Sequence, residues 1–135
     1  MTPETAEHLD KAGEYLVKAR TLLDVVHYND EAGRAAYLAG FHAAEALISE
    51  RTGRVAHSHD GVSSQFHRLT RGDARFDDEL RAFLGRTYNL KAIADYETGP
   101  RSVVARERVE AAILTATRFV ETIAALLKAE PGAFR

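Results

Sequence analysis

The residues best suited to chemistry lie at the end of a long amphipathic segment, between positions 86 and 96. Lys91 falls on the apolar stripe of that segment, where a charged side chain must reach solvent, meet a carboxylate or face a cleft. Asp95 follows four residues later, the spacing at which two side chains pair along one helix. Two interpretations stay open for Lys91 and Asp95: a structural ion pair, or part of an anion-binding cleft. In the second interpretation three further side chains line the cleft, Arg86, Asn89 and Tyr96.

A second polar pair, His42 and Glu45, lies within the most apolar helix that the sequence predicts. The two residues are three positions apart, so they share one helix face. A buried pair of this kind is normally satisfied by hydrogen bonds, either inside the fold or across an interface between two copies of the chain. We interpret His42 and Glu45 as polar residues of the core or of a dimer interface.

His57, His59 and Asp60 carry side chains of metal-ligand type. Their spacing is loose and no third histidine is near in sequence. Loop polarity, with Asp60 as the cap of a short helix, is therefore the better interpretation. The chain has no cysteine, which excludes disulfides, thiolate zinc sites and a cysteine nucleophile. We expect no metal and no cofactor.

Positive charge in this chain is mostly arginine, which supplies 14 of the 18 basic residues. Arginine binds phosphate and carboxylate in bidentate fashion, so a local anion site is compatible with the net charge of −2. That net charge does not indicate a strongly basic nucleic-acid binder. One cluster of arginines is interleaved with acidic residues and is best interpreted as a solvated mixed-charge surface. Its members are Arg68, Arg71, Arg75 and Arg81.

The length of 135 residues and the balance of 45% hydrophobic and 28% charged residues are typical of one globular domain, residues 1–135. No apolar run approaches the roughly 20 residues needed to cross a bilayer, so no membrane association is expected. The acidic, polar start of the chain is not a secretory signal. Together with the absence of cysteine, these features predict a cytoplasmic protein.

Apolar residues recur every three or four positions along most of the chain, and no segment alternates with period two. The sequence therefore predicts an all-α fold, an up-and-down bundle of four long helices plus one short helix. The expected helices cover about 3–27, 29–53, 62–69, 77–96 and 102–130. Asn29 and Ser102 are the expected N-caps of the second and last helices, and Gly53 is the expected C-cap of the second.

Three segments occur in an order and spacing that resembles the HEPN domain family, over roughly residues 5–128. The first runs from Ala36 to Leu47 on the central helix and includes Phe41-His42-Ala43-Ala44-Glu45. The second is His57-Ser58-His59-Asp60-Gly61-Val62, followed by Phe66. The third is Tyr88-Asn89-Leu90-Lys91-Ala92-Ile93-Ala94-Asp95-Tyr96.

The resemblance implies a helical bundle that dimerises, here through parts of the second and fourth helices. It also implies a small nucleotidyltransferase as a protein partner, often within a toxin–antitoxin system. Active members of the family are metal-independent ribonucleases that carry an arginine followed, after four to six residues, by a histidine on the fourth helix. Dimerisation brings two such motifs into one cleft.

This chain departs from the ribonuclease motif. After Arg86 the positions of the histidine hold Lys91, Ala92 and Ile93, and no histidine follows His67. Without an imidazole there, no group titrates near neutrality to move a proton. We therefore predict an interaction module that binds RNA, a nucleotide or a nucleotidyltransferase. The alternative is a divergent metal-independent ribonuclease that uses Lys91, Arg86 and Tyr96.

Arginine–histidine pairs with a similar spacing occur elsewhere in the chain, but off the expected helix. A motif this loose is met by chance in a chain with 14 arginines and six histidines. We attach no catalytic role to these pairs, which are Arg20–His27, Arg51–His57 and Arg54–His59.

Overall fold

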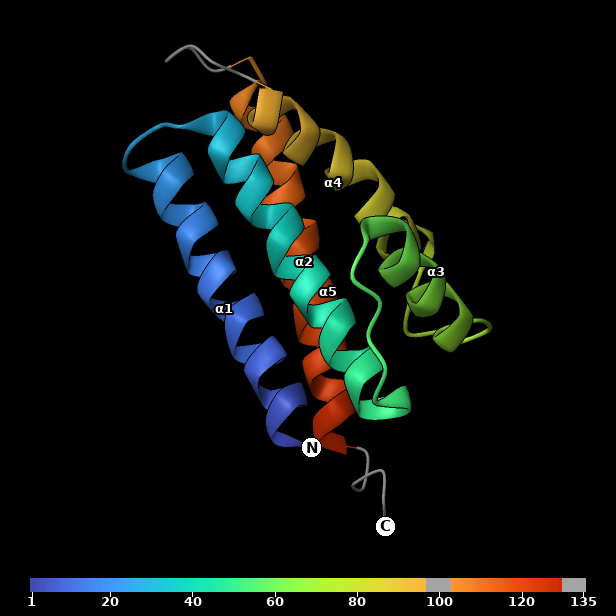
Figure 1. The fold of residues 1–135 in the computed structure, drawn as a ribbon. Helices are drawn as coiled ribbons and strands as arrows, with labels where there is room; N and C mark the ends of the chain where they lie inside the picture. The colour runs from blue at the N-terminus through green and yellow to red at the C-terminus, as the bar shows by residue number, and fades with distance from the viewer. Residues whose placement is uncertain (97–102, 130–135) are drawn as a thin grey trace.

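The computed structural model describes residues 1–96 and 103–129, and in that part of the chain every regular element is an α-helix, as predicted (Figure 1). The helices are α1 Pro3–Asp24, α2 Asn29–Thr52, α3 His59–Leu69, α4 Asp78–Tyr96 and α5 Arg106–Ala129. None of them combines the length and the apolar character that a bilayer-spanning helix requires.

Helix α2 is the centre of the bundle. It contacts each of the other four helices, while α1, α2, α4 and α5 alternate in direction (Figure 1). The sequence explains this position, because α2 is apolar nearly all round and rich in alanine and glycine. Small residues let neighbouring helices approach closely, and at Gly40 the ring of Phe83 from α4 fills the space that a Cβ would take.

The ends of α1 and α2 follow the predicted signals only in part. Thr2 caps α1 as expected, because its hydroxyl accepts a hydrogen bond from the backbone N–H of Thr5 at 3.1 Å. Gly53 ends α2 in the left-handed conformation with φ of 70°, also as expected. The prediction of Asn29 as the N-cap of α2 is wrong. Tyr28 holds the cap position, and the amide of Asn29 instead donates to the carbonyl oxygen of Val104 at 3.2 Å.

Helix α3 begins three residues earlier than predicted, at His59 rather than at position 62. Ser58 is its N-cap, with its hydroxyl accepting from the backbone N–H of Gly61 at 3.0 Å. The prediction of Asp60 as the cap is therefore wrong, because Asp60 already lies in the first turn. As a result His59 is the first residue of a helix, and its backbone is fixed by the cap.

The segment before α5 is held by α2. Helix α5 begins at Arg106, later than the sequence predicts, and the expected cap Ser102 lies outside the described residues. The carboxylate of Asp30, which is buried in the first turn of α2, accepts hydrogen bonds from the backbone N–H groups of Val103 and Val104 at 2.9–3.1 Å. This contact fastens the entry of α5 to the centre of the bundle.

Four phenylalanines form the aromatic part of the core. Phe119 of α5 lies 5.0 Å from Phe66 of α3 and 4.9 Å from Phe83 of α4, measured between ring centroids. Phe76, just before α4, lies edge-on to Phe66 at 5.3 Å. All four side chains are almost fully buried, so this cluster joins α3, α4 and α5 beneath the surface.

Candidate functional site

The three segments that carry the family resemblance meet at one place, between α2, α3 and α4. Tyr37 of α2 is buried, and its hydroxyl lies 2.7 Å from Nδ1 of His59 at the start of α3. The imidazole of His59 stacks on the ring of Tyr88 from α4, with 3.9 Å between centroids and 22° between planes. Tyr88 also meets Tyr37 edge-on at 5.6 Å. The three rings therefore support one another from three different helices.

Charged groups lie beside these rings. The ammonium group of Lys91 is 5.8 Å from the centroid of Tyr88, one helical turn away on α4. It pairs with Asp95 at 2.5 Å, and the opposite oxygen of Asp95 accepts from Nε of Arg34 on α2 at 2.9 Å. The predicted pairing of Lys91 with Asp95 is confirmed, and Arg34 is a third member that the sequence did not indicate.

We call these six residues the α2–α4 polar cluster: Arg34, Tyr37, His59, Tyr88, Lys91 and Asp95. Its protonation states follow from the surroundings. Burial raises the pKa of the Tyr37 phenol far above its usual range, so the phenol stays neutral. Hydrogen bonds from Lys91 and then Arg34 lower the pKa of Asp95, which keeps this carboxylate ionised at neutral pH.

The imidazole of His59 is held in its neutral form. Burial lowers its pKa from 6.5, the nearby charge of Asp60 opposes this, and the positive charge of Lys91 lowers it further. A neutral imidazole has one ring nitrogen that donates and one that accepts. If Nδ1 donates to the Tyr37 oxygen, Nε2 carries a free lone pair and can take up a proton. If Nδ1 accepts from the Tyr37 hydroxyl, Nε2 is a hydrogen-bond donor.

The five predicted cleft residues do not share one face of α4. Lys91 and Asp95 belong to the α2–α4 polar cluster, whereas Arg86 and Asn89 line a groove on the other side, between α4 and α5. Arg108 of α5 faces the same groove, whose floor includes Phe83, Leu90 and Ala112. Tyr96 is 84% exposed at the end of α4. The described residues of a single chain therefore form no one cleft that holds all five.

The predicted pair of His42 and Glu45 is also present, with 2.8 Å between Nδ1 and Oε1. A third residue joins it, because Nδ1 of His8 on α1 lies 3.4 Å from the same oxygen. With His8 included, the group joins α1 to α2 within one chain, and a role of His42 and Glu45 in a dimer interface stays a prediction. Among the other arginine–histidine pairs, Arg20 makes a bidentate contact with Glu110 at 2.8 and 2.9 Å.

The sequence did not indicate Tyr37 as a site residue, and it indicated His59 only as a side chain of metal-ligand type, although both lie in the segments that carry the resemblance. Spacing along the chain gives no sign that His59 contacts Tyr37 and Tyr88, which are 22 residues before it and 29 after it. The signal that was available is the resemblance itself, because each of its three segments contributes a ring to the cluster.

The geometry defines the class of domain: a helical bundle with a polar cluster where α2, α3 and α4 meet. Residues 5–126 match the HEPN domain family. The match covers most of the chain, so the protein belongs to the HEPN family. A comparison with curated protein sequences gives no match.

We expect the imidazole of His59 to titrate below pH 6.5, and substitution of Lys91 by methionine to raise its midpoint, because a positive charge that opposes protonation is removed. Histidine-detected NMR titration measures both values. His67 is the internal control, since its pKa is lowered by burial and by Arg81 and does not depend on Lys91. The unfolded chain binds the proton of His59 more tightly than the folded protein does. The free energy of unfolding should therefore fall as the pH drops from 6.5 to the midpoint of His59 in the folded protein. An unchanged His59 midpoint in the variant contradicts the prediction.

Proposed function

We propose that this HEPN-family protein is a binding module for RNA or a nucleotide, and that the α2–α4 polar cluster holds the ligand. The observation that carries the proposal is the placement of Lys91 and Arg34 next to the stacked rings of His59 and Tyr88. Proteins bind single strands with this combination, in which cations contact phosphates and aromatic rings stack with bases. Tyr88 is 38% exposed, so part of its ring is free to meet a ligand.

The charges of the cluster set the expected strength of binding. Lys91 and Arg34 share one carboxylate, Asp95, so an incoming phosphate must compete with that carboxylate for both cations. Binding through two cations releases few counterions. For a single strand the slope of log affinity against log salt concentration should be about −1.4, from roughly −0.7 per phosphate neutralised. The proposal therefore predicts modest, salt-sensitive affinity.

Fluorescence polarisation with a short, labelled single-stranded RNA tests the proposal. We expect Tyr88→Ala to weaken binding by roughly 5- to 150-fold, because a base stacked on an aromatic ring contributes about 1–3 kcal/mol. Lys91→Ala should weaken binding and flatten the salt dependence. Lys18→Ala is the matched control, since Lys18 also lies beside a tyrosine ring, 5.0 Å from the centroid of Tyr15, but on α1. Equal losses in the Lys18 and Lys91 variants, or no binding by the unaltered protein, contradict the proposal.

A second candidate function is metal-independent ribonuclease activity, and the position of His59 favours it. The fourth helix lacks a histidine, but α3 brings a neutral imidazole against Tyr88, one turn from Lys91. In this candidate Nε2 of His59 accepts the proton of a ribose 2′-hydroxyl as that oxygen attacks the adjacent phosphorus. The bond between phosphorus and the 5′ oxygen breaks, which leaves a 2′,3′-cyclic phosphate, and the departing 5′ oxygen takes a proton from water. Lys91 stabilises the negative charge that develops on the phosphate oxygens.

Incubation of the purified protein with RNA in the presence of a metal chelator separates the two candidates. Cleavage that falls by about 10²- to 10⁴-fold in His59→Ala supports the ribonuclease, since that is the usual contribution of a general base. His57→Ala is the control, because His57 is exposed and only two residues away. Intact RNA after long incubation, together with harmless expression in bacteria, supports the binding module. Growth arrest that is abolished by Lys91→Ala supports the enzyme.

We further propose, from the family resemblance, that the chain forms a homodimer through parts of α2 and α4 and associates with a nucleotidyltransferase. The groove between α4 and α5 offers apolar side chains and two arginines, Arg86 and Arg108, for such contacts. Sedimentation equilibrium measures the dimer directly. Monomers at high micromolar concentration contradict it, and co-purification with a nucleotidyltransferase encoded by a neighbouring gene tests the partner.

A further inference from the structure

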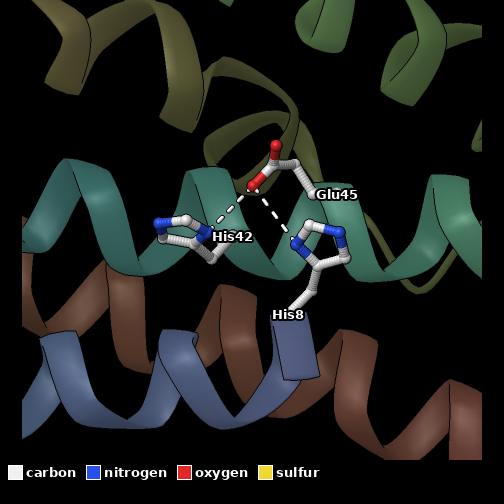
Figure 2. A group of neighbouring side chains, drawn as sticks. All are labelled: His8, His42 and Glu45. Atoms are coloured by element: carbon white, nitrogen blue, oxygen red, sulfur yellow. Dashed lines mark ion pairs between the residues drawn. The ribbon is translucent and has the colours of Figure 1, made fainter. Parts of the chain in front are cut away.

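Three side chains of metal-ligand type converge between α1 and α2, away from the α2–α4 polar cluster (Figure 2). His8 projects from α1, and His42 and Glu45 project from successive turns of α2. One atom from each side chain can be chosen so that all three lie within 4.8 Å of one another. Within residues 1–96 and 103–129 this is the one group of three such residues that lies so close together.

Two atoms of this group are buried without a hydrogen-bond partner among the described residues: Nδ1 of His42 and Oε1 of Glu45. They lie 2.8 Å apart, so the direction of their approach, and not the distance, is what prevents a hydrogen bond. A buried polar atom without a partner is unfavourable, because it has lost its hydrogen bonds to water and gained none in the protein. A cation between them would satisfy both lone pairs at once.

We propose that His8, His42 and Glu45 form a binding site for a divalent transition-metal ion, with Zn²⁺ as the best match. Two imidazole nitrogens and one carboxylate oxygen are a known zinc donor set that leaves a fourth position open. With metal–ligand bonds of 2.0–2.1 Å, tetrahedral ligands are about 3.3 Å apart. The distance of 3.4 Å between Nδ1 of His8 and Oε1 of Glu45 fits this value, and the 2.8 Å between Glu45 and His42 has to widen slightly.

The surroundings suit a cation. The hollow in front of the histidines is lined by three acidic residues, Glu7, Asp10 and Glu14, against one basic residue, Lys11. The ring of His42 is held by Tyr15 of α1, which stacks on it almost in parallel with 5.4 Å between centroids. His8 is partly exposed, so its side chain can turn to close the site. The open position faces this hollow, where water or a carboxylate can complete the coordination.

Zinc titration of the protein, purified without a histidine tag, tests the site. Calorimetry and competition with a zinc-binding dye should give one ion per chain. His8→Ala, His42→Ala and Glu45→Gln should each weaken binding more than roughly tenfold, since even loss of an outer-shell partner costs 10- to 100-fold. His57→Ala, at an exposed histidine of the α2–α3 connection, should leave the affinity unchanged.

Two further measurements keep the test independent of folding. Circular dichroism shows whether each variant remains helical, and Glu45→Gln keeps the size and shape of the side chain that it replaces. Cobalt added in place of zinc should give the visible absorption of a tetrahedral site in the unaltered protein. This absorption should be lost in those variants of His8, His42 and Glu45 that circular dichroism shows to be still helical. Absence of stoichiometric zinc binding, or equal affinity in the unaltered protein and His8→Ala, overturns the proposal and leaves an ion pair between α1 and α2.

Discussion

Replacement of Gly40 by alanine should lower the free energy of unfolding by about 1–3 kcal/mol, although alanine is the better helix former. A Cβ at position 40 would overlap the ring of Phe83, with Cδ2 and Cζ at 2.9 Å and Cε2 closer still. That ring cannot swing aside freely, because it is buried and stacked on Phe119 at 4.9 Å. Either the ring leaves its rotamer or α2 and α4 separate, and both lose packing.

Gly85→Ala is the control for this experiment, because a Cβ at that position on α4 has no atom within 4 Å other than those of its chain neighbours and its own helix backbone. It should stabilise the protein by about 0.5–1 kcal/mol through helix propensity alone. Urea denaturation followed by circular dichroism measures both changes. Combination of Gly40→Ala with Phe83→Leu should restore part of the lost stability, since the two residues contact each other. Equal unfolding free energies of the two glycine variants would show that the close approach of α2 and α4 is not as described.

Replacement of Phe119 by alanine should cost about 3–5 kcal/mol, the usual range for loss of a fully buried phenylalanine. Phe119 has no exposed surface and contacts Phe66, Phe76 and Phe83, so its removal opens a cavity where α3, α4 and α5 meet. A domain of this size has a total stability of about 5–15 kcal/mol, so the variant should be close to unfolding at 37 °C.

Leu114→Ala is the matched control for Phe119, because Leu114 lies on the same helix but is 56% exposed. Its effect should stay within about 0.5 kcal/mol. Thermal and urea unfolding of the two variants under the same conditions give the comparison. A loss of less than 1 kcal/mol on removal of Phe119 would contradict the described core.

The all-α fold followed from periodicity, because an amphipathic helix repeats every 3.6 residues whatever its neighbours are. The errors lie at helix starts, where contacts distant in sequence decide. The local sequence favours Asn29 as an N-cap, yet its side-chain amide donates a hydrogen bond to the carbonyl oxygen of Val104, 75 residues away. Asp60 and Ser58 are both good capping residues, and nothing in the local sequence ranks one above the other.

The candidate site was predicted in part. Lys91 and Asp95 are four residues apart on one helix, so their pairing could be inferred from sequence alone. Arg86 and Lys91 are five residues apart, and at about 100° per residue they point in clearly different directions, so a cleft that holds both needs more than one face of α4. Arg34 and His8 could not be found in this way, since periodicity gives the face of a helix but not the partner that packs against it.

Asp95 has a consequence for any ligand of the polar cluster. Its carboxylate lies between a lysine of α4 and an arginine of α2, the two cations that would contact a phosphate in the proposed binding mode. The protein thus carries an internal mimic of its proposed ligand, tethered to the same helix and present at high local concentration. A single phosphate makes too few contacts to displace the carboxylate of Asp95 easily. A strand can displace it, because neighbouring phosphates and a stacked base add further contacts. The site should therefore select for polymer length before it selects for sequence.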